Sequence, residues 1–296
     1  MRFNSKKPKI LVVGSCSIDL VLNTEKHPDP NETVMAYKSE HFFGGKGANQ
    51  AVGCARLGAE VALVGCIGKD GQGGQILRNL SKEGVNISRM VEAEDGDTGS
   101  AYVVAAEGKN AIVVIPAANN KLSPADVDLA EDLVKDANLV LLQLEIPMAV
   151  VNHTISLCKK HHVKVGIYAA PAFELAKEVI DYASFIVVKS VDIEKVFAGE
   201  SADGINKKYP NKLFIRDDSN STTFFTGEEM KYFRNDPSEV LHKMGMGDAF
   251  TSGFAIAFCH GNTTEECVKF GNRVSMKVAS NRGSQGGLPF LSDLTF

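Results

Sequence analysis

The sequence predicts an α/β fold with a mainly parallel central sheet, helices on both faces of that sheet, and a second, smaller β-sheet. Short apolar runs alternate along the chain with helical patterns, as a parallel sheet covered on both faces requires. Two regions break this alternation, because apolar residues continue there without a helix between them. With 296 residues, 44% of them hydrophobic, the chain can bury a substantial core.

Short apolar runs are predicted as the strands of the central sheet, because strands buried on both faces are apolar throughout. They cover residues 10–13, 61–65, 139–142, 163–167, 185–188 and 212–215. The stretches between them have apolar residues at helical spacing. The predicted helices cover residues 48–57, 75–83, 126–135, 148–160, 174–182 and 193–197. No internal repeat or linker divides the chain, so we expect one domain over residues 1–296.

The two exceptional regions are residues 34–43 and 100–115, which alternate or run apolar without a helix. This pattern suits antiparallel strands with one exposed face. We expect them to form the small sheet, inserted at about residues 15–43 and 98–116. Such a sheet leaves one hydrophobic face to cover, so we expect two subunits to pair through it as a homodimer.

Charge and composition exclude several classes of protein. The net charge is −4, from 32 basic and 36 acidic residues, so nucleic acid is not expected as a partner. No run of roughly 18 apolar residues predicts a membrane span, and the N-terminus leads directly into the first strand, so we expect a cytoplasmic protein. The six cysteines lack both Cys-x-x-Cys and metal-ligand spacing, which indicates reduced, packed thiols.

Two glycine-rich segments carry the functional prediction: residues 44–51 (Gly-Gly-Lys-Gly-Ala-Asn-Gln-Ala) and residues 245–250 (Gly-Met-Gly-Asp-Ala-Phe). Glycines before a helix let backbone N–H groups approach a ligand, and the helix N-terminus favours negative charge. Asp248 would lie in the first turn of an apolar helix. There it could take a proton from a hydroxyl while the amides of Gly245, Met246, Gly247 and Asp248 neutralise a phosphoryl group in transfer. Either segment alone fits ordinary turn and cap chemistry.

Residues 44–51, read with residues 56–59 (Arg-Leu-Gly-Ala), resemble the N-terminal signature of the ribokinase branch of the PfkB carbohydrate kinase family. Residues 245–250 resemble the C-terminal signature of that family, and the resemblance covers nearly the whole chain. The resemblance implies a ribokinase-like three-layer α/β/α domain, with the small sheet as a lid over the sugar site. It also implies ATP and Mg²⁺ as cofactors, and the lids of this family often pair two subunits.

For the sugar, the resemblance implies a set of residues that hold its hydroxyls. They are Asp19, Gly45, Lys46, Asn49 and Glu145, with Asp248 reaching the acceptor hydroxyl. Carboxylates accept hydroxyl hydrogen bonds while Asn and Lys donate, so polyol recognition needs this mixture. Taken singly, Asp19 could end a strand, Glu145 could cap the next segment, and Lys46 could be a solvated charge. Ser17 stands where ribokinases usually have Asn, which puts ribose itself in doubt.

The segment before Asp248 departs from the family. Relatives usually read Asp-Thr-x-Gly-Ala-Gly-Asp, whereas residues 242–248 read His-Lys-Met-Gly-Met-Gly-Asp. The first Asp and the Thr help to hold a monovalent cation in ribokinases, and hard cations need oxygen ligands. His242 and Met244 supply no side-chain oxygen, so we expect weak or absent activation by potassium. A large rate increase on replacing an inert organic cation with potassium would contradict this expectation.

The segments that should bind nucleotide are also altered. The family's Asn-x-x-Glu, which positions magnesium-bound water and phosphate, corresponds to residues 189–192 (Lys-Ser-Val-Asp). Asp192 is therefore the candidate Mg²⁺ residue, and Lys189 could either contact phosphate or pair with Asp192. The family's phosphate loop corresponds to residues 216–221 (Arg-Asp-Asp-Ser-Asn-Ser), where two carboxylates disfavour polyphosphate. Arg216 could offset one of them, and the Asp pair is interpreted as a solvated turn in preference to a magnesium site.

The last part of the chain again resembles the family. Residues 270–272 and 282–285 resemble the adenine-side helix and the closing loop, which makes Asn272 and Gly283 candidate nucleotide contacts.

Two functions from different classes compete. One is an ATP-dependent kinase for the primary hydroxyl of a pentose or related sugar. The other is a catalytically inactive protein that binds a sugar or nucleoside on a kinase scaffold. Retention of Asp248 favours the kinase, because a binding protein has less need of a base there. A third hypothesis, NAD binding at the glycine-rich residues 68–74, is weak because the glycines do not form Gly-x-Gly-x-x-Gly after a strand. That stretch is interpreted as a turn before a helix.

Overall fold

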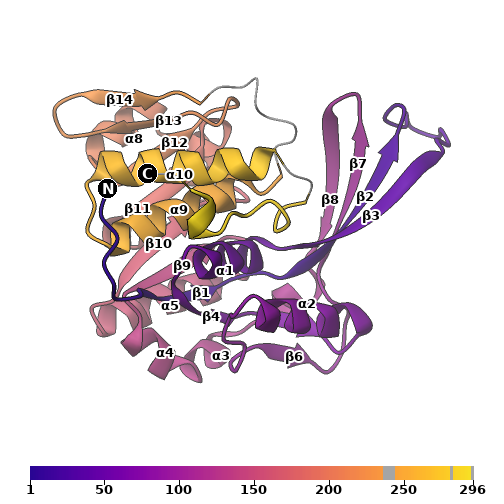
Figure 1. Cartoon of the computed structure of the whole chain (residues 1–296), viewed down its shortest axis with the longest axis horizontal. Helices are drawn as coiled ribbons and strands as arrows, with labels where there is room; N and C mark the ends of the chain where they lie inside the picture. Colours follow the sequence, from indigo (N-terminus) through magenta and orange to yellow (C-terminus); the bar gives the residue numbers. More distant parts are fainter. Residues whose placement is uncertain (236–243, 281–282, 295–296) are drawn as a thin grey trace.

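The computed structural model describes residues 1–235, 244–280 and 283–294, and these form a three-layer body with a projecting small sheet (Figure 1). The central sheet has eight strands in the order β14-β13-β12-β11-β10-β9-β1-β4. Its strands are β1 (Lys9–Val13), β4 (Glu60–Val64), β9 (Leu139–Gln143), β10 (Lys164–Tyr168), β11 (Phe185–Lys189), β12 (Leu213–Arg216), β13 (Thr222–Phe225) and β14 (Met230–Phe233). The strands from β4 to β12 are parallel, and the hairpin β13–β14 adds an antiparallel edge. Every predicted strand of this sheet is present within one residue of its expected bounds.

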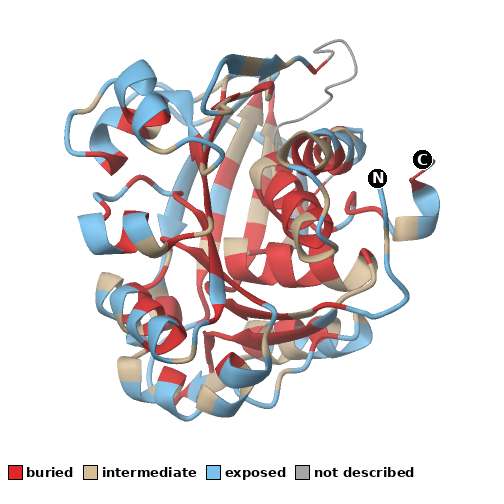
Figure 2. Cartoon of the chain, turned by 90° about the vertical axis from the view of Figure 1, so that its left-hand side faces the viewer, coloured by how far each residue is buried: buried red, intermediate tan, exposed pale blue. Residues whose placement is uncertain are grey.

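Helices cover both faces of the central sheet (Figure 2). One face carries α1 (Lys46–Arg56), α2 (Gly71–Lys82), α9 (Met246–Cys259) and α10 (Thr264–Ala279). The other carries α3 (Pro124–Asp128), α4 (Glu131–Asp136), α5 (Met148–Lys160), α6 (Lys177–Tyr182), α7 (Ile193–Val196) and α8 (Ala202–Lys208). Successive side chains of a strand point to opposite faces of the sheet. Ile10 and Val12 of β1 therefore pack in the core beneath α1 and α9, whereas Leu11 and Val13 pack in the core on the side of α5.

Some predicted helices differ from the structure. The helix expected at residues 126–135 is divided into α3 and α4 by a turn at Leu129 and Ala130. The helix expected from residue 174 begins at Lys177. Helix α8 and the hairpin β13–β14 were not predicted, although the β-branched and aromatic residues of β13 are typical of a strand.

The small sheet, called the lid below, has the order β3-β2-β7-β8 and projects from the main body (Figure 1). Its strands are β2 (Ser17–Thr24), β3 (Ala36–Gly44), β7 (Ser100–Ala106) and β8 (Lys109–Ile115). The antiparallel strands expected at residues 34–43 and 100–115 are present, because β3 pairs with β2 and β8 pairs with β7 in this way. The central pair β2 and β7, however, is parallel. Both strands start at the base of the lid, where Ile18 lies opposite Ser100, and run outward together. A pair of β-strands β5 (Cys66–Gly68) and β6 (Val91–Ala93) completes the fold.

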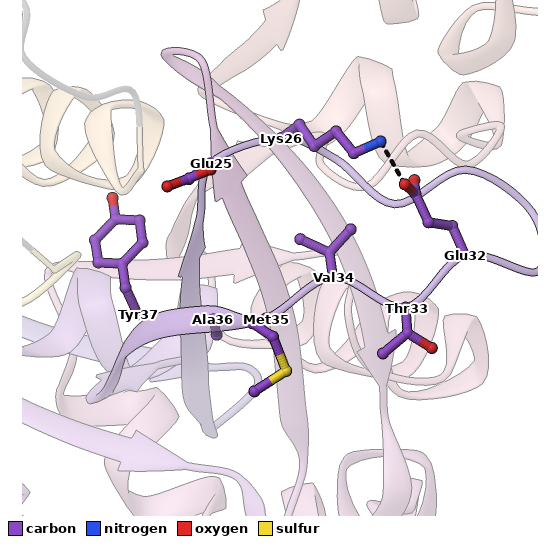
Figure 3. Close-up of a pocket in the computed structure, with 8 residues that line it drawn as sticks. All are labelled: Glu25, Lys26, Glu32, Thr33, Val34, Met35, Ala36 and Tyr37. Atoms are coloured by element: carbon purple, nitrogen blue, oxygen red, sulfur yellow. Dashed lines mark ion pairs between the residues drawn. The ribbon is translucent and has the colours of Figure 1, made fainter.

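A cavity of about 420 Å³ lies at the far end of the lid, in the connection between β2 and β3 (Figure 3). Its lining includes the ion pair of Lys26 with Glu32 and the exposed side chains of Met35 and Tyr37. None of the predicted site residues lines it. In the described part of the chain, the helices are too short or too polar to span a bilayer.

Candidate active site

The predicted sugar-side residues converge at the carboxyl-end edge of the parallel strands, where ligands bind in open α/β sheets. Asp19 lies on β2, which follows β1, and Glu145 lies two residues beyond the end of β9. Helices α1 and α9 begin at the same edge, at Lys46 and Met246. Direct hydrogen bonds from α1 to Asp248 join the two helices there.

The first turn of α9 is built on glycines where any side chain would be strained. Gly245 has φ 73°, in the left-handed region, and a Cβ there would lie 2.9 Å from Ser284 Cα. A Cβ on Gly247 would lie 2.1 Å from the Tyr168 hydroxyl. The amides of a first helical turn have no acceptor within the helix, so those of Met246, Gly247 and Asp248 form a suitable anion site.

Asp248 is only 3% exposed, and both of its carboxylate oxygens are hydrogen-bonded. Asn49 Nδ2 donates to Oδ2 at 3.0 Å, and Gln50 Nε2 donates to Oδ1 at 3.1 Å. Burial raises the pKa of Asp248, whereas Lys46 and the two amides oppose the rise. A carboxylate with a raised pKa at a helix N-terminus is suited to act as a general base.

Lys46 and Glu145 form a partly buried ion pair next to Asp248. The Lys46 backbone N–H donates to Glu145 Oε2 at 3.0 Å, and its Nζ lies 3.5 Å from Oε1. Ser15 Oγ also donates to Oε2. Burial opposes the charge of Glu145, but Lys46 and Ser15 hold its pKa below the ordinary value. Burial likewise opposes the charge of Lys46, yet Glu145 and Asp248 raise its pKa, so Lys46 remains an ammonium.

Asp19 lies at the base of the lid with its carboxyl group against Gly44. Ser17 Oγ donates to Asp19 Oδ1 at 3.0 Å, and a Cβ on Gly44 would lie 2.1 Å from the same oxygen. Burial raises the pKa of Asp19 to about 6, although the Ser17 hydrogen bond opposes it. Asp19 lies within β2, so it does not simply end a strand. Gly45 is the N-cap of α1 and has φ 85°, and a Cβ there would meet Cys16 Cα at 2.5 Å.

Sequence reasoning missed residues that support this site. Gln50 and Gln143 are fully buried behind Asp248, Tyr168 packs against Gly247, and Ser15 holds Glu145. Gln143 could have been noticed, because it is a polar residue at the end of the otherwise apolar strand β9.

The structure gives two predicted nucleotide contacts partners within the protein. Arg216 is buried and donates to Asn272 Oδ1 at 2.9 Å, to Ser275 Oγ at 3.0 Å and to Thr222 Oγ1 at 3.2 Å. Burial lowers the pKa of Arg216 to about 10. Ser275 Oγ in turn donates to the carbonyl of Met246, so the cluster supports the first turn of α9. This placement favours a structural role for Arg216 and Asn272 over the predicted contact with nucleotide.

The remaining predicted residues that the structure describes lie outside the hydrogen-bonded group around Asp248. Lys189, the last residue of β11, is exposed, and Asp192, three residues later, is half-buried; these two described residues form no ion pair with each other. Asp217 accepts from the backbone N–H groups of Ser219 and Ser221, each at 2.9 Å, which is a turn and agrees with the interpretation of this segment. Gly283 approaches the lid, because a Cβ there would lie 2.5 Å from the Phe42 ring. His242 lies outside the described residues.

The glycine-rich residues 68–74 run from the end of β5 into the first turn of α2, so the helix begins at Gly71, before the expected residue 75. Asp70 caps that helix by accepting from the Gly73 N–H at 2.7 Å, and it also accepts from the Thr98 N–H at 2.8 Å. These hydrogen bonds account for the glycine-rich stretch as the start of a helix, so a dinucleotide-binding role is not needed to explain it.

Comparison with known proteins shows the family to which this chain belongs. A model of the pfkB family carbohydrate kinases matches residues 7–291. The chain belongs to the PfkB family. It is therefore a sugar kinase, a phosphotransferase with an alcohol group as acceptor that uses ATP.

Individual relatives of this PfkB kinase agree in sequence and in fold. It is 36% identical to a ribokinase of Bacillus subtilis over 280 residues, 95% of this chain and 96% of that protein. It is 28% identical to a deoxyribokinase of Salmonella typhimurium over 95% of both chains. The structure of Arabidopsis thaliana ribokinase complexed with ribose and ATP has a TM-score of 0.84 at 27% identity, over 97% of both chains. The sequence relatives and the solved structure together show that this chain has a ribokinase-like fold.

Proposed function

We propose that this PfkB kinase transfers the γ-phosphoryl group of ATP to a primary hydroxyl of a pentose. The observation that carries the proposal is the position of Asp248, a buried carboxylate in the first turn of α9. The charges of Lys46 and Glu145 shift the pKa of Asp248, and the charge of Asp248 in turn shifts the pKa of Asp19. The relatives named ribokinase and deoxyribokinase support a pentose as the acceptor.

In this proposal Asp248 takes the proton of the sugar hydroxyl as that oxygen attacks the γ-phosphorus. The bond from phosphorus to the leaving oxygen of ADP breaks in the same displacement. The amides of Met246 and Gly247, with that of Asp248, stabilise the charge on the phosphoryl oxygens. Burial raises the pKa of Asp248, and Lys46 with the Asn49 and Gln50 amides opposes this rise by favouring the ionised form.

The sugar would be held between the lid and the start of α1. Asp19 and Glu145 accept hydroxyl hydrogen bonds, while Lys46 and the Gly45 segment lie beside them. Asn49 Oδ1 is buried without a hydrogen-bond partner in the described structure, which leaves it available to a hydroxyl donor. Ser17 gives its hydroxyl to Asp19, so we propose that it orients this carboxylate.

The nucleotide side fits Mg²⁺ through a single carboxylate. Magnesium in kinases keeps several waters and binds one or two carboxylates together with the phosphates. Asp192 supplies such a carboxylate, because it lies three residues beyond the carboxyl end of β11, and its charge contributes to the raised pKa of Tyr168. When bound, Mg²⁺ would neutralise charge on the phosphates. Lys189, exposed beside Asp192, is proposed to contact phosphate.

We also propose a homodimer that pairs through the lid. The exposed apolar side chains of the lid include Tyr37, Ile112, Val113 and Val114, which are 52–71% exposed. A second lid would remove them from water. The use of ATP and the six free thiols support action in the cytoplasm.

The experiment that tests the function is release of ADP from ATP and Mg²⁺ across pentoses, ketohexoses and nucleosides. The Asp248→Asn protein is the blank, and ³¹P NMR of the product identifies the hydroxyl that is phosphorylated. We expect turnover with a pentose, phosphate on its primary hydroxyl, and no sugar-dependent turnover in the blank. Sugar binding without turnover would instead indicate a binding protein on a kinase scaffold.

A further inference from the structure

A chain of buried amides leads from the central sheet to Asp248. Gln143, the last residue of β9, donates from Nε2 to Gln50 Oε1 at 2.6 Å. Gln50, on α1, donates from its own Nε2 to Asp248 Oδ1 at 3.1 Å. Three elements distant in sequence are therefore connected by two consecutive hydrogen bonds that end on the proposed base.

The two glutamines are isolated from any substrate. Both are 0% exposed, so neither can reach a sugar or a nucleotide in solution. Gln143 Oε1 lies against the backbone of Gly14, where a Cβ would approach it to 2.0 Å. Gln143 Oε1 accepts no hydrogen bond in the described structure, whereas the Gln143 amide nitrogen donates to Gln50 Oε1. Gln50 must then present its NH₂ group, and not its oxygen, to Asp248.

We propose that Gln50 is a positioning residue for the base, and that Gln143 locks the orientation of Gln50. Gln50 fixes the plane of the Asp248 carboxylate and favours its ionised form, so that one oxygen is directed to the acceptor hydroxyl. This inference rests on the proposed role of Asp248 as base. It adds a function for two residues that contact no ligand.

The other charged and titratable groups around Asp248 come from four elements. They are Lys46 of α1, Glu145 after β9, Asp19 of β2 and Tyr168 of β10. All four remain unchanged in the variants below. A change in the titration of Asp248 in those variants can therefore be assigned to the amides.

The test compares Gln50→Met with the double variant Gln50→Met/Gln143→Met. The single variant removes the donor to Asp248 but leaves the Gln143 amide buried without its acceptor. The double variant replaces both amides with apolar groups of similar length, which restores a satisfied core. Ile155→Ala is the matched control, because it opens a cavity beneath the other face of the sheet without touching Asp248.

Two readouts are needed. The first is the ¹³C NMR titration of the Asp248 carboxyl carbon, assigned as the aspartate resonance that is lost in Asp248→Asn. The second is the acidic limb of the pH profile of kcat/KM, which reports the base of the free enzyme. Loss of a hydrogen bond to the ionised form should raise the pKa by roughly 1 in both Gln50 variants. Activity should then fail at correspondingly higher pH, with turnover reduced roughly 10- to 100-fold.

The outcomes separate the possibilities. Recovery of stability in the double variant together with a persistent rise of the Asp248 pKa supports the inference. An unchanged pKa in the double variant, or an equal rise in Ile155→Ala, overturns it and leaves the sugar kinase assignment intact. Full turnover by Asp248→Asn would overturn the proposed base itself, and with it this inference.

Discussion

At the scale of single residues, the described part of the site holds more carboxylates than cations. Among the described residues, Asp19, Glu145 and Asp248 share the ammonium of Lys46. Glu145 has that ammonium as a direct partner, so its pKa is lowered, whereas burial raises the pKa of the other two. Carboxylates whose pKa values are driven apart by their surroundings suit different tasks, here proton transfer and binding of hydroxyls.

The raised pKa of Asp19 predicts a specific pH dependence of stability. Its folded value of about 6 lies above the ordinary 3.8, so between these values the folded protein binds more protons than the unfolded chain. Stability from this group is present at low pH and declines as pH rises through that window. We expect the free energy of unfolding of the wild type, minus that of Asp19→Asn, to fall by about 2 kcal/mol between pH 4 and pH 7.

Urea unfolding at a series of pH values measures this difference. Glu266→Gln serves as a control, because the pKa of Glu266 is lowered to about 2 and its contribution should change with the opposite sign. A difference between wild type and Asp19→Asn that stays constant with pH would show that Asp19 titrates normally.

At the scale of elements, the C-terminal segment is fastened to α1 and α2 by Arg56. Its guanidinium binds Glu83 with two hydrogen bonds of 2.7 and 2.8 Å, and it donates to the carbonyls of Gln285 and Leu288. Ser284, in the same segment, packs against Gly245 at the start of α9. Arg56 therefore stabilises the segment that lies beside the proposed anion site.

Replacement of Arg56 by Met should lower the free energy of unfolding by about 3 kcal/mol, because it leaves the largely buried Glu83 without its partner. Denaturant unfolding at neutral pH measures the change. Lys177→Met is the control, since it breaks an exposed pair with Asp181 on α6 and should leave stability unchanged within error. Equal effects of the two substitutions would contradict the structural role of Arg56.

The sequence predicted those elements whose signals are local. Strands such as β1 and β9 are recognisable from apolar residues, and the starts of α1 and α9 from glycines with positive φ at Gly45 and Gly245. The parallel pairing of β2 with β7 could not be predicted, because it depends on contacts about 80 residues apart in the chain.

Only some residues of the site could be predicted, because the roles of the others depend on partners far away in the chain. Asp248 and Lys46 lie in recognisable segments, whereas the role of Gln143 depends on a partner 93 residues away. Arg216 is the converse case, in which the structure favours a role other than the predicted one. A cation in the place of a phosphate loop suggested a ligand contact, but burial beside Asn272 and Ser275 supplies its acceptors within the protein.

At the scale of the whole molecule, the lid projects from the main body (Figure 1), and several of its apolar side chains are exposed. We expect sedimentation equilibrium to show a dimer for the wild type. Val113→Lys, at a position 66% exposed, should raise the dissociation constant at least about 100-fold, because the dimer would bury an unpaired ammonium. Leu129→Lys, at an exposed position between α3 and α4, should leave it unchanged. A monomeric wild type would exclude pairing through the lid.

The whole molecule brings the lid, the start of α1 and the start of α9 together around one carboxylate. The measurement that tests this account most directly is the comparison of sugar affinity and turnover in Asp248→Asn. Calorimetry gives the sugar dissociation constant and coupled ADP release gives kcat. We expect a dissociation constant within a few fold of the wild type and a kcat lower by roughly 10²- to 10⁴-fold, because the substitution keeps size and removes the base. An unchanged kcat, or an equal loss of binding and turnover, would contradict the central claim that Asp248 is the base of this sugar kinase.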